Sequence, residues 1–142
     1  QIGVLTFVDF TVTSTPGKSL TIAIQCGNEQ IVVFNFEVSL RSCKVGEFEN
    51  NKACEVCLAN TYSFDPSDPC KECPSEAKCF GEARVVPKEG YWRPSVLSDK
   101  FYECPRKESC LELSEAEANE TVKCDEGYTG TLCGGCIEDF KM

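Results

Sequence analysis

The sequence lacks histidine altogether and holds a single methionine and a single tryptophan among its 142 residues. Without an imidazole, the Ser-His-Asp and Cys-His forms of nucleophilic catalysis are excluded, and so is histidine as a general base. Long apolar runs are missing as well, since the longest aliphatic and aromatic stretch covers only residues 31–34. A membrane-spanning helix requires about 18 such residues. The sequence therefore predicts no membrane span in this chain.

Positive charge is scarce, with 14 Lys and Arg against 23 Asp and Glu and a net charge of -9. An acidic surface repels phosphate groups, and the longest basic cluster is Arg106-Lys107. The segment at residues 15–18 lacks the first glycine of a phosphate-binding loop. We therefore expect no nucleic-acid partner.

Two carboxylates, Asp65 and Asp68, come nearest to an acid and base pair. They lie in the turn FDPSDPC, where aspartate commonly caps local backbone. Oxygen ligands for calcium are plentiful, but the EF-hand pattern and the acidic pre-cysteine motif of calcium-binding EGF modules are both missing. A weak calcium site stays open on composition alone. We predict a protein that is not an enzyme and that holds no cofactor.

Twelve cysteines dominate what is present. Cytosolic proteins are kept reduced, whereas small secreted domains use disulfides to hold loops around a small core. The even number allows each cysteine a partner. We therefore predict an extracellular or cell-surface protein and, since the chain starts at Gln1, a processed or partial form of a longer product.

Residues 1–42 hold one cysteine and have the pattern of an antiparallel β region. Three segments are rich in Val, Ile, Phe and Thr with partial alternation: IGVLTFVDFTV, SLTIAIQC and QIVVFNFEVSL. Pro16-Gly17 predicts a turn after the first, and Gly27-Asn28 predicts a two-residue type II′ turn between the other two. The third segment has apolar residues on both alternating faces, with Ile31 and Val33 on one side and Val32, Phe34, Phe36, Val38 and Leu40 on the other, so we expect cover on both sides of the sheet.

The predicted sheet is too small to close by itself, because about 40 residues seldom bury enough surface to fold alone. Its cover could come from the cysteine-rich region, from sequence missing from this chain or from a neighbouring copy. Edge strands with little charge pair readily with other chains, and residues 1–12 carry only Asp9. Closure within the chain and closure between chains both stay open.

Residues 43–142 hold the other eleven cysteines and have the pattern of loops and short strands. Ser114 and Glu117 have capping-box spacing and predict a short helix at residues 114–120. The sequence thus predicts a small disulfide-rich fold, with an N-terminal antiparallel β region (1–42) followed by an extended, loop-rich cysteine ladder (43–142).

Two Cys-x-x-Cys pairs with twelve residues between them raise the question of zinc or disulfides: Cys54, Cys57, Cys70 and Cys73. Four thiolates in such pairs could close a tetrahedral zinc site. The gap is shorter than the roughly 15 to 20 residues usual for that pattern, and eight further cysteines would be left without any histidine. Disulfides are therefore the favoured interpretation.

The segment CDEGYTGTLC at residues 124–133 has the spacing of the last disulfide loop of an EGF-like module. From about residue 42 onward, the chain resembles the cysteine-rich growth-factor-receptor or ephrin-receptor-like modules of large surface proteins, notably those of protists. The motifs that carry this resemblance are CKVGEFENNKACEVCLANTYS, CPSEAKCFGEARVVPKEGYWRP, FYECP and CDEGYTGTLCGGC. Asn60 stands where the family usually has glycine in a turn. Because asparagine tolerates left-handed geometry, we expect the turn to persist.

The resemblance to EGF-like modules implies a bond between Cys124 and Cys133. Pairing of near neighbours adds four bonds and leaves Cys26 with Cys136, although twelve cysteines permit very many other pairings. The four are Cys43 with Cys54, Cys57 with Cys70, Cys73 with Cys79 and Cys104 with Cys110. In laminin-like relatives the cysteine matching Cys136 pairs further downstream, and this chain ends at Met142 without such a residue. Each region holds an odd number of cysteines, so full oxidation requires a bond across the boundary or between chains.

Two further positions complete the prediction. Trp92 in GYWRP is expected to anchor a small core, with Arg93 over an aromatic ring, in preference to a carbohydrate-binding platform. Asn119 opens the single N-glycosylation sequon, and its polar surroundings predict a surface position.

These features predict a non-enzymatic extracellular glycoprotein that builds a surface or fibrous assembly, such as a filament, through its N-terminal strands. We expect a homo-oligomer or polymer, with other surface proteins or glycans as further partners. The alternative, which the resemblance implies about as readily, is an adhesion or ligand-binding segment of a larger receptor-type ectodomain.

Overall fold

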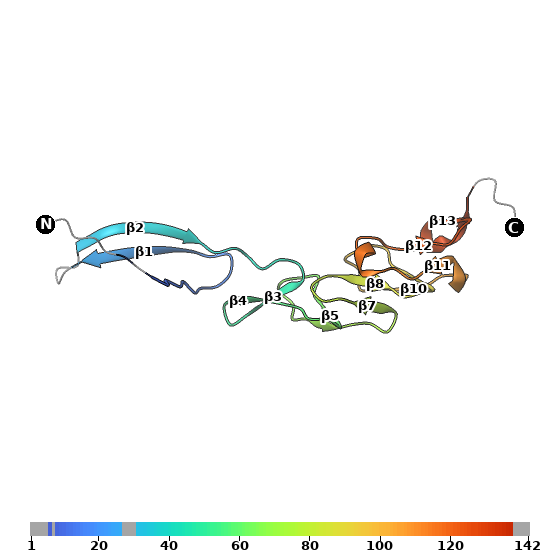
Figure 1. The fold of residues 1–142 in the computed structure, drawn as a ribbon, viewed down its shortest axis with the longest axis horizontal. Helices are drawn as coiled ribbons and strands as arrows, with labels where there is room; N and C mark the ends of the chain where they lie inside the picture. Colours follow the sequence, from blue (N-terminus) through green and yellow to red (C-terminus); the bar gives the residue numbers. More distant parts are fainter. Residues whose placement is uncertain (1–5, 7, 27–30, 138–142) are drawn as a thin grey trace.

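The computed structural model describes residues 6, 8–26 and 31–137, without the side chains of residues 25, 26 and 31–33. Within these residues the protein is elongated: one long hairpin forms one end, and a series of short hairpins extends to the other (Figure 1). Every described sheet has two antiparallel strands, and the only helices in the same ranges are short 3-10 turns. The predicted fold class, a β region followed by a cysteine ladder, is confirmed.

The N-terminal hairpin consists of β1 (Ser19–Cys26) and β2 (Ile31–Ser39). The predicted turn before it is present, because Gly17 has a φ of 77° and its N–H donates to Arg41 O at 3.1 Å. The strand predicted within residues 1–12 is wrong for residues 6 and 8–12, which form no strand. Asp9 has a φ of 57°, a left-handed conformation that interrupts an extended run. The predicted turn at residues 27 and 28 lies outside the described residues.

The ladder that follows is a chain of short hairpins between neighbours in sequence. Its strands pair two by two in this order: β3 (Glu47–Asn50) with β4 (Ala53–Val56), β5 (Thr61–Tyr62) with β6 (Lys71–Glu72), β7 (Ala77–Cys79) with β8 (Val85–Pro87), β9 (Tyr91–Trp92) with β10 (Tyr102–Glu103), β11 (Cys110–Leu111) with β12 (Lys123–Cys124), and β13 (Tyr128–Thr129) with β14 (Gly135–Cys136). The 3-10 turns are η1 (Lys107–Ser109), η2 (Glu115–Glu117) and η3 (Thr131–Cys133). Asn60 has a φ of 67°, so the predicted left-handed turn is confirmed.

Five disulfides link the ladder, and they are the five near-neighbour pairs predicted from the sequence. Their Cα–Cα separations lie between 5.3 and 6.4 Å, within the ordinary range. The four cysteines considered for zinc are divided among three of these bonds, so their sulfurs do not gather as free thiolates. The predicted bond between Cys26 and Cys136 is not formed: Cys136 is an exposed free thiol, and the side chain of Cys26 lies outside the described residues.

Two small clusters form the core of the ladder. The first consists of Tyr62, Ala77, Cys79 and Val85, with Phe64, Cys73 and Phe101 against it. The second consists of Cys104, Cys110 and Cys133, with Trp92, Val122, Cys124 and Tyr128 against it. Trp92 therefore packs on buried cysteines, as expected of a core anchor. Disulfide sulfur here replaces the aliphatic side chains that a larger domain would use.

Gly46, where the chain enters the ladder, has no room for a side chain. Its φ is 89°, and a Cβ would lie 2.8 Å from backbone atoms of Glu82 and Ala83. Gly130 has a φ of 77°, yet a Cβ there would meet nothing within 4 Å. Since strained backbone costs about 1 to 3 kcal/mol, we expect Gly130→Ala to lower the free energy of unfolding by about 1 kcal/mol and Gly46→Ala by about 3 kcal/mol. Chemical denaturation measures the free energy of unfolding of both variants. Equal decreases in the two variants would contradict the close backbone approach at Gly46.

The helix predicted at residues 114–120 is shorter than expected: it is the 3-10 turn η2, which makes the predicted capping contact. The backbone N–H and the hydroxyl of Ser114 donate to Glu117 Oε2 at 2.9 and 2.7 Å. Lys123 Nζ donates to Glu117 Oε1 at 2.8 Å. The hydrogen bond from Lys123, followed by the two from Ser114, lowers the pKa of Glu117 from 4.5 to about 2.

Because the pKa of Glu117 is lowered, the stability of the turn η2 should depend on pH. Because the folded state lowers the pKa, the stabilisation from ionised Glu117 is complete above its ordinary pKa of 4.5 and is lost as the pH falls towards about 2. An NMR titration of the Glu117 carboxyl should give a pKa near 2, and Lys123→Met should raise it towards 4.5. The control Lys78→Met removes an ion pair with Glu112 instead and should leave the pKa of Glu117 unchanged. An ordinary pKa in the unmodified protein would contradict the capping geometry.

Candidate interaction surface

One face of the β1–β2 hairpin is apolar over residues 20–24 and 34–38. Residues directly opposite each other in an antiparallel pair share a face. On this face the opposed pairs are Leu20 with Val38, Ile22 with Phe36 and Ile24 with Phe34. The rings of the two phenylalanines also contact each other, with centroids 5.8 Å apart. We call these six side chains the apolar hairpin face.

The opposite face is mainly polar over residues 19–23 and 35–39. It carries the pairs Ser19 with Ser39, Thr21 with Glu37 and Ala23 with Asn35. The two serine hydroxyls are hydrogen-bonded at 2.9 Å. The expectation that β2 is apolar on both faces rests on Ile31 and Val33 for this second face, and their side chains lie outside the described part. Over the described side chains, only one face of the hairpin calls for apolar cover.

None of the side chains described for residues 6–45, which include the hairpin, is buried. Phe34 is 58% exposed, and in the preceding segment Phe10 and Val8 are 60% and 78% exposed. The other members of the apolar hairpin face are half-buried. A two-stranded hairpin is only marginally stable in water without a packing partner. The described residues thus leave an apolar surface that is not closed.

The edges of the hairpin are also weakly protected against pairing with another strand. Lysine, proline and short strands are the usual protection. β1 has no charged residue over its eight positions, and β2 has Glu37 alone. The β-bulge between Ile24 and Gln25 disturbs the far end of the ladder of hydrogen bonds, but the rest of β1 is regular. The described edges of the hairpin therefore carry few of the features that usually prevent pairing.

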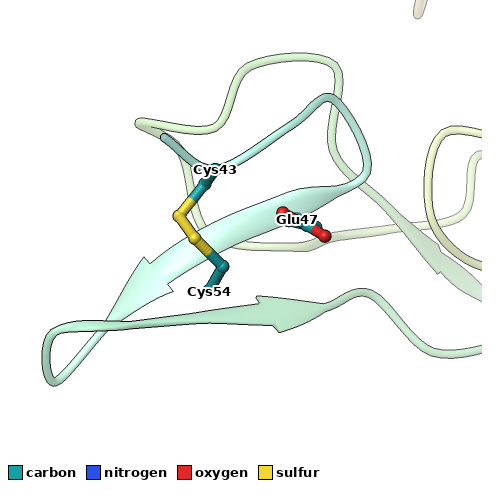
Figure 2. Close-up of side chains that lie close together, drawn as sticks. All are labelled: Cys43, Glu47 and Cys54. Carbon is teal, nitrogen blue, oxygen red and sulfur yellow. A yellow bond between two sulfur atoms is a disulfide. The ribbon is translucent and has the colours of Figure 1, made fainter. Parts of the chain in front are cut away.

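A separate group of possible metal ligands lies near the start of the ladder and consists of Cys43, Glu47 and Cys54 (Figure 2). Such a group could hold a metal ion if its sulfurs were free, but the two cysteines form a disulfide. The carboxylate of Glu47 accepts hydrogen bonds from Arg41 at 2.6 and 3.0 Å and from the Lys44 N–H at 3.0 Å. The hydrogen bond from Arg41, followed by that from Lys44, lowers the pKa of Glu47. The two sulfurs and the carboxylate thus already have bonding partners within the protein.

The carboxylates considered for catalysis have local structural partners. Asp65 Oδ1 accepts the Ser67 N–H at 2.9 Å, which lowers the pKa of Asp65. Asp68 pairs with Lys71 at 3.0 Å. The turn-capping role predicted for Asp65 is confirmed. Asn119 is exposed, as the sequon requires.

Arg93 is the residue whose role the sequence did not reveal. It is fully buried, and its guanidinium donates to Val96 O at 2.8 Å, Ala118 O at 2.6 Å and Glu120 O at 2.7 and 3.2 Å. Burial lowers its pKa to about 10, so it is charged at neutral pH. The predicted stacking of Arg93 on a ring is wrong. That contact is made by Arg106, 6.0 Å from the centroid of the Tyr128 ring.

Comparisons of the chain with protein families, curated proteins and solved structures gave no match. Within the described ranges, no helix has the length and apolarity required to cross a bilayer. The five disulfides fit a secreted or extracellular protein, because such bonds form and persist in oxidising compartments.

Proposed function

We propose that the protein is a non-enzymatic extracellular structural module that builds a surface or fibrous assembly through its N-terminal hairpin. The observation that supports this proposal is the apolar hairpin face, six apolar side chains on a sheet in which none of the described side chains is buried. Burial of apolar surface contributes about 25 cal/mol per Å². A second copy can supply that burial, since the same face and the same open edges are present on every copy.

The cysteine ladder supports the same proposal by its shape and its resemblance. It holds the hairpin away from the far end of an elongated molecule (Figure 1). EGF-like and growth-factor-receptor-like modules, which its motifs resemble, serve mainly as spacers and contact surfaces. The ladder would then set the spacing between assembly contacts, and an N-linked glycan on Asn119 would be carried on its surface.

Negative-stain electron microscopy of the native, non-reduced protein tests the proposal. The double variant Ile22→Thr with Phe36→Thr makes one opposed pair of the apolar hairpin face polar while keeping a residue that favours strands. The matched control, Ala23→Thr with Asn35→Thr, places the same residues in the neighbouring pair on the polar face. We expect filaments or ordered arrays of the unmodified protein and the control, and isolated particles of the variant.

Two outcomes would contradict the proposal. The first is isolated particles of the unmodified protein at all concentrations, which would favour the alternative, a segment of a larger receptor-type ectodomain that binds surface proteins or glycans. The second is an assembly that the apolar-face variant leaves unchanged. An unaltered near-ultraviolet circular dichroism signal from Trp92 would show that the ladder is folded in all three proteins.

A further inference from the structure

The segment before the hairpin has the side chains of a strand but no strand partner. Over residues 8–13, VDFTVT, apolar and polar residues alternate without a break. Such alternation is typical of a strand with one buried face. None of residues 8–14 lies in a described strand, and no backbone hydrogen bond joins them to another described residue. We call residues 8–13 the amphipathic segment.

The apolar side chains of the amphipathic segment are poorly covered. Val8 and Phe10 are exposed, and Val12 is half-buried. The left-handed backbone of Asp9 turns the segment away from an extended course. Because burial of apolar surface is favourable, a site that accepts the segment as an extended strand would be stabilised by it.

The outer edge of β1 offers such a site. Among the described strands β1 pairs with β2 alone, so its other edge has no strand partner in this part of the chain. β1 carries no charged residue, whereas β2 carries Glu37. An added strand must match the two faces of the hairpin, between which the residues of β1 alternate. Those on the apolar hairpin face are Leu20, Ile22 and Ile24, and those between them are Thr21 and Ala23.

The turn between the amphipathic segment and β1 fixes their register within one copy. The Lys18 N–H donates to Thr15 O at 3.2 Å and closes a tight turn around residues 16 and 17. The Gly17 N–H donates to Arg41 O at 3.1 Å, which ties the same turn to the chain after β2. In a hairpin the turn sets which residues lie opposite each other. A strand continued from this turn would therefore pair outward from Thr15 and Lys18.

This register is wrong by one residue. Counted outward from the turn, Val12 would lie opposite Thr21 and Phe10 opposite Ala23. Both of these β1 residues belong to the mainly polar face. Since opposed residues share a face, the apolar side chains of the segment would lie on the polar face, and Thr11 would lie on the apolar one. A segment from another copy is not bound by this turn and can match both faces.

We propose that residues 8–13 of one copy add as a strand to the outer edge of β1 on the next copy. This inference rests on the proposed assembly and names the contact that builds it. An antiparallel arrangement shifted by one residue pairs apolar with apolar side chains: Val8 with Ile24, Phe10 with Ile22 and Val12 with Leu20. Main-chain hydrogen bonds and alternate side chains are the two parts of this recognition mode.

The added strand also changes the stability of the sheet. A two-stranded hairpin is marginal in water, whereas three strands with an apolar face are sufficient for independent stability. The contact joins two different surfaces of the molecule, so it is heterologous and can continue from copy to copy. Asp9 has to change from its left-handed conformation to an extended one when the strand forms.

Photo-crosslinking of the full chain tests the contact. p-Benzoylphenylalanine replaces Phe10, and isotopically light and heavy copies are mixed as dilute monomers and then concentrated. We expect cross-linked peptides that join residue 10 of one copy to residues 20–24 of another, with light and heavy peptides in the same product. Val8→Thr with Val12→Thr in the probe-bearing chain should abolish these products, because the alternation is lost. The matched control, Thr11→Ser with Thr13→Ser, keeps the apolar side chains and should retain them.

Three results would overturn the proposal. They are the absence of cross-links to β1, products that never combine light and heavy peptides, and mixed products that the Val8 and Val12 variant leaves unchanged. Filaments that persist without a cross-link to β1 would contradict the strand addition and leave assembly through the apolar hairpin face. Mixed cross-links to β1 that occur in dimers alone would support the strand addition and contradict the fibrous assembly.

Discussion

Complete reduction of the five disulfides is expected to unfold residues 43–137 in the absence of denaturant. Each bridge contributes about 2 to 5 kcal/mol in a small secreted domain. A whole domain usually has a free energy of unfolding of only about 5 to 15 kcal/mol. The loss of all five bridges should therefore remove more free energy than the folded ladder has as net stability. The buried clusters give the structural reason: Cys104, Cys110 and Cys133 are themselves 4%, 0% and 1% exposed and form the centre of one core.

Amide NMR spectra before and after treatment with dithiothreitol measure this effect. We expect the resonances of Val85 and Val86, both fully buried, to lose their dispersion once mass spectrometry shows ten additional alkylated thiols. Oxidised dithiothreitol at the same concentration is the control and should leave the spectrum unchanged. A dispersed spectrum of the fully reduced chain would mean that the ladder is held by packing and hydrogen bonds alone.

Replacement of Arg93 is expected to have the next largest effect. Its guanidinium joins the loop after β9 to the segment around η2, because its acceptors are Val96 O, Ala118 O and Glu120 O. A hydrogen bond from a charged group contributes about 1.5 to 3 kcal/mol, and a buried carbonyl left without a donor costs about 1 to 3 kcal/mol. Arg93→Met keeps much of the apolar volume and removes every donor. Removal of the buried charge also removes the cost of keeping that charge out of water, which offsets part of the loss. We therefore expect the free energy of unfolding to fall by about 3 to 5 kcal/mol.

Chemical denaturation of Arg93→Met and of Arg41→Met separates this role from a general effect of losing an arginine. Arg41 is 56% exposed and pairs with Glu47 at 2.6 Å. Exposed ion pairs contribute about 0 to 1 kcal/mol, so the Arg41 variant should be nearly as stable as the unmodified protein. Similar stability losses in the two variants would show that the buried hydrogen bonds of Arg93 contribute no more than a surface pair.

The sequence predicted those features that depend on residues close together in the chain. Pro16-Gly17 forms the expected turn and Asn60 the expected left-handed turn, because each turn is decided by its own residues. The five disulfides follow near-neighbour pairing because the hairpins between them are short and local. Ser114 and Glu117 meet for the same reason.

Features that depend on distant residues were missed. The acceptors of Arg93 at Ala118 and Glu120 are 25 and 27 positions away, and no local pattern marks them. The strand expected in residues 1–12 has suitable side chains, but a left-handed Asp9 interrupts it. The alternation in the sequence already placed Phe34, Phe36 and Val38 on one face of their strand. Which residues of β1 oppose them depends on the register, which composition alone does not fix. The apolar face shared by both strands therefore became visible only when the strands were paired.

Hydrogen exchange of the β1 and β2 amides, measured across a range of protein concentrations, tests the proposed assembly most directly. Closure of the apolar hairpin face by a second copy predicts that protection of these amides rises with concentration. The amides of Val85 and Val86 lie in the buried core of the ladder and should be equally protected at every concentration. Full protection of β1 and β2 in a dilute, monomeric sample would contradict the proposal, because the hairpin would then be closed within its own chain.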